Sequence, residues 1–187
     1  MTLAEFLRSI VTALDANGVA YMITGSLAAA VHGAGRATMD ADLVVQVTPA
    51  QLARLIHALE APGRYVAREA AMAALAHESM FNVIDTETGW KADLIPCKAR
   101  PFSQAEFARR QSIELDGVRL WIASVEDIII SKLEWAKLGG SARQLEDVAA
   151  LLRVAGDDLD RPYLDHWVEE LQLSAQYRAA SVRECSA

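Results

Sequence analysis

An apolar segment that ends in a glycine-serine pair, followed later by two aspartates separated by one residue, constrains this chain more than any other feature. Residues 21–26 read Tyr-Met-Ile-Thr-Gly-Ser, and residues 40–45 read Asp-Ala-Asp-Leu-Val-Val. The first segment predicts a strand that ends in a tight turn, and residues 27–32 are rich in helix formers. Side chains two positions apart on a strand point to the same face, so we expect Asp40 and Asp42 to lie side by side.

Two carboxylates this close repel each other unless a positive charge lies between them. Mg²⁺ is the obvious candidate, because it binds to a few carboxylates together with substrate phosphates. Gly25 and Ser26 lie where the predicted strand meets the predicted helix, and the free N–H groups and the helix dipole attract phosphate there. A helix N-cap is the alternative role for Ser26, and both roles are compatible. The pattern is therefore typical of a site for a triphosphate and two metal ions.

This order of motifs resembles the DNA polymerase β-like nucleotidyltransferase superfamily. The signature of that superfamily is a Gly-Gly or Gly-Ser pair, a short helix, and then Asp-x-Asp or Asp-x-Glu between apolar residues. Gly25, Ser26, Asp40 and Asp42 match it position by position. The family adds a third carboxylate on a later strand, and the best match to it is Asp93 in the segment Trp-Lys-Ala-Asp-Leu-Ile. The matching motifs extend over about residues 21–95.

Within that superfamily, the chain resembles the small bacterial nucleotidyltransferases that include toxins of type IV toxin–antitoxin and abortive-infection systems. Those proteins tend to carry an Arg-x-Thr-x-Asp-x-Asp-Leu run. The run is matched here by Arg36, Thr38, Asp40, Asp42 and Leu43. Arg36 would brace the acidic pair or hold a phosphate with its planar guanidinium group, and a solvated loop arginine is an equal alternative. Thr38 would fix the loop by a hydrogen bond to the backbone.

The resemblance implies an α/β (α+β) fold, in which a mixed sheet flanked by helices forms a palm. It also implies an enzyme that transfers a nucleoside monophosphate from an NTP such as ATP to an acceptor hydroxyl. Two Mg²⁺ ions, or Mn²⁺, would be held by Asp40, Asp42 and Asp93, and Asp93 would also take the acceptor's proton. Gly25, Ser26 and Arg36 would bind the nucleotide. The acceptor would be a tRNA, a protein or a small molecule, and a cognate antitoxin is a candidate partner.

Other interpretations remain open. Asp93 lies in an apolar segment, and a buried aspartate needs a partner, which Lys91 or an arginine could supply without any catalytic role. Lys132 and Lys137 are candidates for contact with phosphate or acceptor, although the pattern favours a surface position for each. At the level of the whole chain, the alternatives are a catalytically weak toxin–antitoxin component that acts by binding protein, or an α/β domain whose motifs match by coincidence.

The predicted strands are concentrated in the first two thirds of the chain, and the last third is predicted to be helical. We expect strands near residues 21–24, 40–47, 80–85 and 90–95, and a hairpin around Asp116 and Gly117. Helices are expected to begin at Thr2, Thr48, Arg68, Ser103, Ser124, Ser141 and Asp160. The best boundary is near Ala123, which gives a palm domain over residues 1–123 and a helical unit over residues 124–187 that packs on it.

Charge and composition narrow the range of functions. The net charge of −7 argues against a broad basic surface for nucleic acid, although a local basic stretch spans Lys98 to Arg110. Two distant cysteines, Cys97 and Cys185, suggest no disulfide framework, which favours a reducing cytoplasm. The N-terminus lacks the pattern of a signal peptide, and we expect no membrane association, because the longest apolar stretch is too short to span a bilayer.

Overall fold

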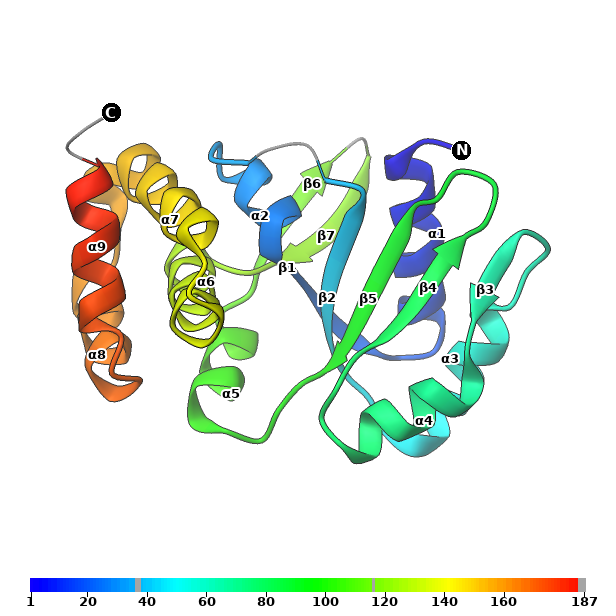
Figure 1. Ribbon diagram of the computed structural model, residues 1–187. Helices are drawn as coiled ribbons and strands as arrows, with labels where there is room; N and C mark the ends of the chain where they lie inside the picture. Colours follow the sequence, from blue (N-terminus) through cyan, green and yellow to red (C-terminus); the bar gives the residue numbers. More distant parts are fainter. Residues whose placement is uncertain (36–37, 116, 185–187) are drawn as a thin grey trace. The chain divides into compact units, whose positions relative to one another are not determined.

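The computed structural model describes residues 1–35, 38–115 and 117–184. Within these residues, seven strands form one mixed sheet in the order β3-β4-β5-β2-β1-β7-β6 (Figure 1). Their bounds are β1 Ala20–Thr24, β2 Asp40–Gln46, β3 Arg64–Val66, β4 Phe81–Asp85, β5 Lys91–Pro96, β6 Gln111–Leu115 and β7 Val118–Ile122. Strand β2 is antiparallel to β1 and parallel to β5. The predicted α/β fold with a mixed sheet is confirmed.

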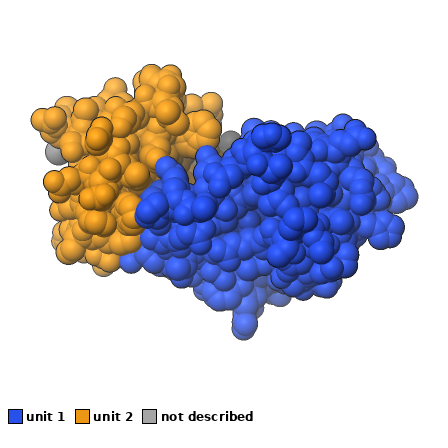
Figure 2. Space-filling model, turned by 90° about the horizontal axis from the view of Figure 1, so that it is seen from below, with its two compact units in different colours: residues 1–24, 37–122 blue, residues 25–36, 123–187 orange. Residues whose placement is uncertain are grey.

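The chain divides into two compact units, which Figure 2 colours separately. The first consists of residues 1–24 and 37–122, and the second consists of residues 25–36 and 123–187. The first unit holds the whole sheet. The short helix that begins with the glycine-serine pair groups with the C-terminal helices, so the second unit is built from two separate stretches of chain.

In the first unit, the helices are α1 (Leu3–Ala16), α3 (Pro49–Leu59), α4 (Arg68–Ala76) and α5 (Pro101–Ala108). Helix α1 lies behind the strands in Figure 1 and packs against β1 and α3. Both α1 and α3 begin with a capping box, in which Thr2 pairs with Glu5 and Thr48 with Gln51. Their buried side chains include Phe6, Ile10, Leu52 and Ile56.

Strands β2 and β5 each bury an apolar set of side chains on one face and carry acidic side chains on the other. Ala41, Leu43 and Val45 of β2 are fully buried, whereas Asp40, Asp42 and Gln46 alternate with them and are partly or fully exposed. Strand β5 follows the same rule, because Ala92 and Leu94 are fully buried. Since side chains alternate along a strand, burial of the apolar set directs the acidic set to the opposite face.

The second unit is helical. It contains α2 (Gly25–Val31), α6 (Val125–Gly139), α7 (Ala142–Ala155), the 3₁₀ turn η1 (Gly156–Asp158), α8 (Arg161–Glu170) and α9 (Ser174–Glu184). Helix α6 is the centre of the unit, because it packs against α2, α7, α8 and α9. Ile129 and Leu133 of α6 and Val148 and Leu152 of α7 are buried. None of the helices in the described ranges combines the length and the apolar character needed to cross a membrane.

Candidate active site

The pairing of β2 with β5 places Asp40, Asp42 and Asp93 on one face of the sheet, which we call the acidic face. These strands run parallel, with Asp42 opposite Asp93 and Asp40 opposite Lys91. Residues opposite each other on neighbouring strands share a face, and residues two apart on one strand also share it. Asp40, Asp42, Lys91 and Asp93 therefore project to the same side of the sheet, as the sequence predicted for Asp40 and Asp42.

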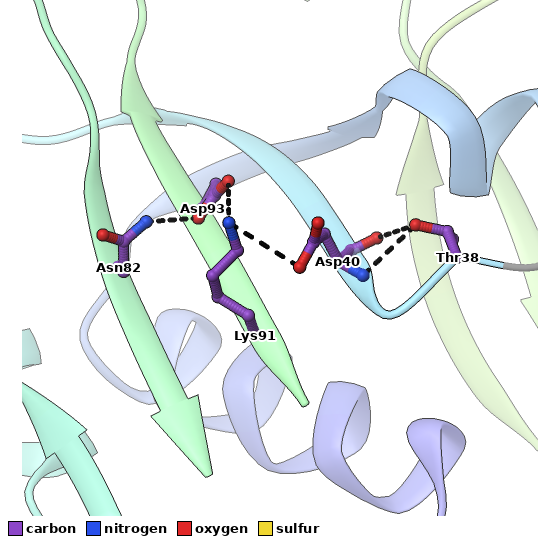
Figure 3. Close-up of polar contacts among 5 residues, drawn as sticks. All are labelled: Thr38, Asp40, Asn82, Lys91 and Asp93. Atoms are coloured by element: carbon purple, nitrogen blue, oxygen red, sulfur yellow. Dashed lines mark hydrogen bonds and ion pairs between the residues drawn. The ribbon is translucent and has the colours of Figure 1, made fainter. Parts of the chain in front are cut away.

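Asp93 is the most buried of the three aspartates, with only 6% of its surface exposed. Its Oδ1 atom accepts a hydrogen bond from Nδ2 of Asn82 on the neighbouring strand β4, and its Oδ2 atom lies 3.1 Å from Nζ of Lys91 (Figure 3). A buried carboxylate is tolerated when it is paired and hydrogen-bonded. The expectation that Lys91 could partner a buried Asp93 is thus confirmed.

Lys91 also contacts the first aspartate of the motif. Its Nζ atom lies 3.6 Å from Oδ1 of Asp40, whose side chain is about half exposed, so one ammonium group lies between two carboxylates (Figure 3). The hydrogen bond to Asp93 raises the pKa of Lys91, against the lowering effect of desolvation, and the charges of Asp93 and Asp40 add to the increase. Lys91 is therefore a charged cation between Asp40 and Asp93.

The loop before β2 is fixed by Thr38. Its Oγ1 atom accepts a hydrogen bond from the Asp40 N–H at 3.2 Å and donates one to the Asp40 carbonyl oxygen at 3.0 Å. This confirms the structural role predicted for Thr38. Arg36, which was predicted to contact phosphate or the acidic pair, lies outside the described residues.

The glycine-serine pair begins helix α2 directly after the last residue of β1. Thr24 pairs with Asp42 in the sheet, and Gly25 follows it with a φ angle of 66°. That value lies in the left-handed region, which glycine adopts without the steric cost of a side chain. The sharp change from strand to helix at the predicted position is therefore explained by the glycine. Gly25 and Ser26 belong to the helical unit.

The donor chemistry of the acidic face fits a divalent cation, because three carboxylates project from two adjacent strands and hard cations prefer oxygen ligands. Within residues 1–35, 38–115 and 117–184, however, no group of three or more His, Cys, Asp or Glu side chains is arranged to hold a metal ion. The positive charge beside the carboxylates is the ammonium group of Lys91. Metal binding by Asp40, Asp42 and Asp93 thus stays a prediction.

The sequence did not predict the contact of Asn82 with Asp93, and the surface position predicted for Lys132 is wrong. Asn82 is a polar residue between the buried Phe81 and Val83, and this alternation is the signal that could have identified it. Lys132 was expected at the surface but is only 4% exposed, because its Nζ atom binds Asp147 at 2.7 Å within the helical unit. Lys137 is exposed, as expected, and its Nζ atom donates to the carbonyl oxygens of Leu171 and Gln172.

A separate pocket of about 340 Å³ lies at the other end of β2 and β5. Gln46, Thr48, Pro96 and Cys97 are among its lining residues, whereas Asp40 and Lys91 are at the beginning of the two strands. Cys97 is a free cysteine, and burial raises the pKa of its thiol. A thiol with a raised pKa is a poor nucleophile near neutral pH.

No protein-family model matches the chain, and no curated protein matches it significantly. Solved structures do resemble it. The crystal structure of ANT(2″)-Ia in complex with adenylyl-2″-tobramycin has a TM-score of 0.58 at 16% identity, covering 98% of this chain and 99% of that chain. An antigenic nucleotidyltransferase-like protein from Paracoccidioides brasiliensis has a TM-score of 0.57 at 19% identity, covering 92% and 91%. The chain therefore has the fold of nucleotidyltransferases, as its motifs predicted.

Proposed function

We propose that the chain is an enzyme that transfers a nucleoside monophosphate from an NTP, with ATP as the expected donor, to an acceptor hydroxyl. One observation supports this most strongly. Asp42 and Asp93 are aligned on adjacent parallel strands, with Asp40 on the same face, in a fold shared with nucleotidyltransferases. Three carboxylates and one lysine leave an excess of negative charge on this face, and binding of divalent cations would offset the repulsion between the carboxylates.

The residues of the acidic face have distinct roles in this proposal. Asp40, Asp42 and Asp93 would bind divalent cations, two Mg²⁺ ions in the expected form, which supply charge neutralisation at the phosphates. Oδ2 of Asp93 would accept the proton of the acceptor hydroxyl. The acceptor oxygen then forms a bond to the α-phosphorus, the bond from that phosphorus to the bridging oxygen breaks, and pyrophosphate leaves. Positioning and electrostatics provide most of the rate enhancement in such reactions.

The turn after β1 would bind the polyphosphate. The backbone N–H groups of Gly25 and Ser26 and the Ser26 hydroxyl are suitable hydrogen-bond donors to phosphate oxygens. Arg36 would add a charged contact to the same groups. The position of the turn along the chain supports this assignment. The turn directly follows Thr24, which lies opposite Asp42 on the neighbouring strand.

The net charge favours a small cationic acceptor over a large nucleic acid. With a net charge of −7, the chain lacks the overall positive charge that RNA-binding proteins use to contact phosphates. ANT(2″)-Ia, which has the same fold, has been seen with an adenylylated aminoglycoside. A polyamine-like sugar with free hydroxyls is therefore the first acceptor class to test, and tRNA and protein are the second and third.

The test is transfer of label from each α-³²P-labelled NTP in the presence of Mg²⁺. Reactions would contain a panel of aminoglycosides, bulk tRNA or cell extract, and products would be separated by chromatography. We expect transfer by the wild type and by Asp165→Asn, which removes an exposed carboxylate in α8. Asp42→Asn should reduce transfer by at least about a hundredfold, since it removes a ligand charge from the reaction centre.

A catalytically weak toxin–antitoxin component is the alternative, and the same proteins distinguish it. If no NTP is consumed with any acceptor, while a protein partner binds wild type and Asp42→Asn equally well, the enzyme proposal is wrong. Loss of partner binding in Asp42→Asn would not rescue it, because catalysis would still be absent.

A further inference from the structure

The ammonium group of Lys91 lies against two of the three carboxylates that would bind divalent cations in the proposed function. It is 3.1 Å from Oδ2 of Asp93 and 3.6 Å from Oδ1 of Asp40, and these two carboxylates are among the three that would bind divalent cations. The contact is built into the sheet. Lys91 is opposite Asp40 on the neighbouring strand and two residues before Asp93 on its own strand, so one side chain reaches both (Figure 3).

An ammonium group and a divalent cation compete for these oxygens. The ammonium group occupies lone pairs that a metal ion would use, and two positive charges a few ångströms apart repel each other. The side chain of Lys91 is 30% exposed, and four flexible carbon–carbon bonds connect its charge to the backbone. It can therefore move its charge away from Asp93 without any change in β5.

We propose that Lys91 is an internal cation that neutralises Asp40 and Asp93, and that a divalent metal ion must displace it in order to bind there. The proposal rests on the proposed function, because it assumes that Asp40 and Asp93 bind metal. Lys91 and Asn82 together satisfy the buried Asp93 and keep it in position. On metal binding, Lys91 leaves Asp93 but remains on the same face of the sheet. Lys91 therefore raises the metal concentration at which the site fills.

The test compares Mn²⁺ binding by the wild type, Lys91→Met and Lys98→Met, measured from the electron paramagnetic resonance signal of free Mn²⁺. Lys98→Met is the matched control, because it makes the same chemical change at an exposed position outside the site. We expect Lys91→Met to bind Mn²⁺ about two- to tenfold more tightly than the wild type, as the loss of two competing ion pairs implies. Lys98→Met should bind as the wild type does.

The melting temperature distinguishes displacement of Lys91 by metal from a purely structural role of Lys91. In EDTA, Lys91→Met should melt at a lower temperature than the wild type, because Asp93 loses its counter-ion. Saturating Mn²⁺ should remove this difference, since the metal then supplies the positive charge. A difference that persists unchanged in Mn²⁺ would overturn the proposal.

A measurement on the wild-type protein tests the proposal even if Lys91→Met does not fold. Reductive methylation of Lys91, followed by mass spectrometry, should be faster with Mg²⁺ than in EDTA, and that of Lys98 should not change. An equal rate at Lys91 with and without Mg²⁺ would contradict displacement.

The Mn²⁺ binding measurements distinguish failure of this inference from failure of the proposed function. If Mn²⁺ binds wild type and Lys91→Met equally, this inference fails and the proposed function stands. If Mn²⁺ binds none of the proteins, both fail.

Discussion

At the scale of the residue, the arrangement of the acidic face depends on the hydrogen bond and the ion pair that stabilise the buried carboxylate of Asp93. Asp93 has a cation on one oxygen and an amide donor on the other, and these come from two different strands. The alternation of polar and apolar residues in the sequence predicted that Asp40 and Asp42 share a face. It could not predict which residue of β5 lies opposite Asp42, because that register depends on contacts between segments far apart in the chain.

Asn82→Leu tests the amide donor. The substitution leaves Oδ1 of the buried Asp93 without this hydrogen bond, and we expect the free energy of unfolding to fall by about 1–3 kcal/mol. Urea denaturation followed by circular dichroism would measure the change. Gln111→Leu, on the exposed strand β6, is a control that also replaces an amide by leucine and should change the free energy far less. Equal effects of the two substitutions would show that the bond to Asp93 is unimportant.

At the scale of the element, local signals predicted the helices well and the shortest elements poorly. The capping boxes at Thr2 and Thr48 lie within four residues, so sequence alone locates the starts of α1 and α3. Strand β3 was missed, because its three residues are held by pairing with β4, which the local sequence does not encode. Helix α9 lies within the stretch that was predicted to be helical, but its start was not predicted, because its sequence mixes small and polar residues with little helical periodicity.

Thr48→Ala tests the cap of α3. The Thr48 hydroxyl accepts a hydrogen bond from the Gln51 N–H at 3.3 Å, and the Gln51 side chain bonds back to the Thr48 N–H. Loss of the hydroxyl should lower the free energy of unfolding by about 1 kcal/mol. Thr48→Ser keeps the hydroxyl and should retain most of this stability. Urea denaturation of both variants provides the measurement, and equal losses in the two would contradict a capping role.

At the scale of the whole molecule, the stability of the sheet should depend on pH at the alkaline end. Tyr21 in β1 is almost fully buried, and burial raises its pKa from 10.0 to about 12. The folded chain therefore holds this proton more tightly than the unfolded chain does. Its contribution to stability is complete below pH 10 and is lost as the pH rises from about 10 to 12.

Tyr21→Phe isolates this effect, because phenylalanine keeps the ring and has no proton to lose. The wild type should lose stability relative to Tyr21→Phe as the pH rises through that range. Urea denaturation at a series of pH values would show the two curves diverging. Parallel curves would mean that Tyr21 does not link unfolding to pH.

The two-segment composition of the helical unit has a consequence for protein engineering. Because α2 lies between the two parts of the sequence motif and its Ala28 and Ala29 are buried, a chain cut after Ile122 would retain this helix but lack α6, its packing partner. A single break point therefore cannot exchange the C-terminal part between relatives as a cassette. A functional chimaera would have to transplant both segments from the same parent.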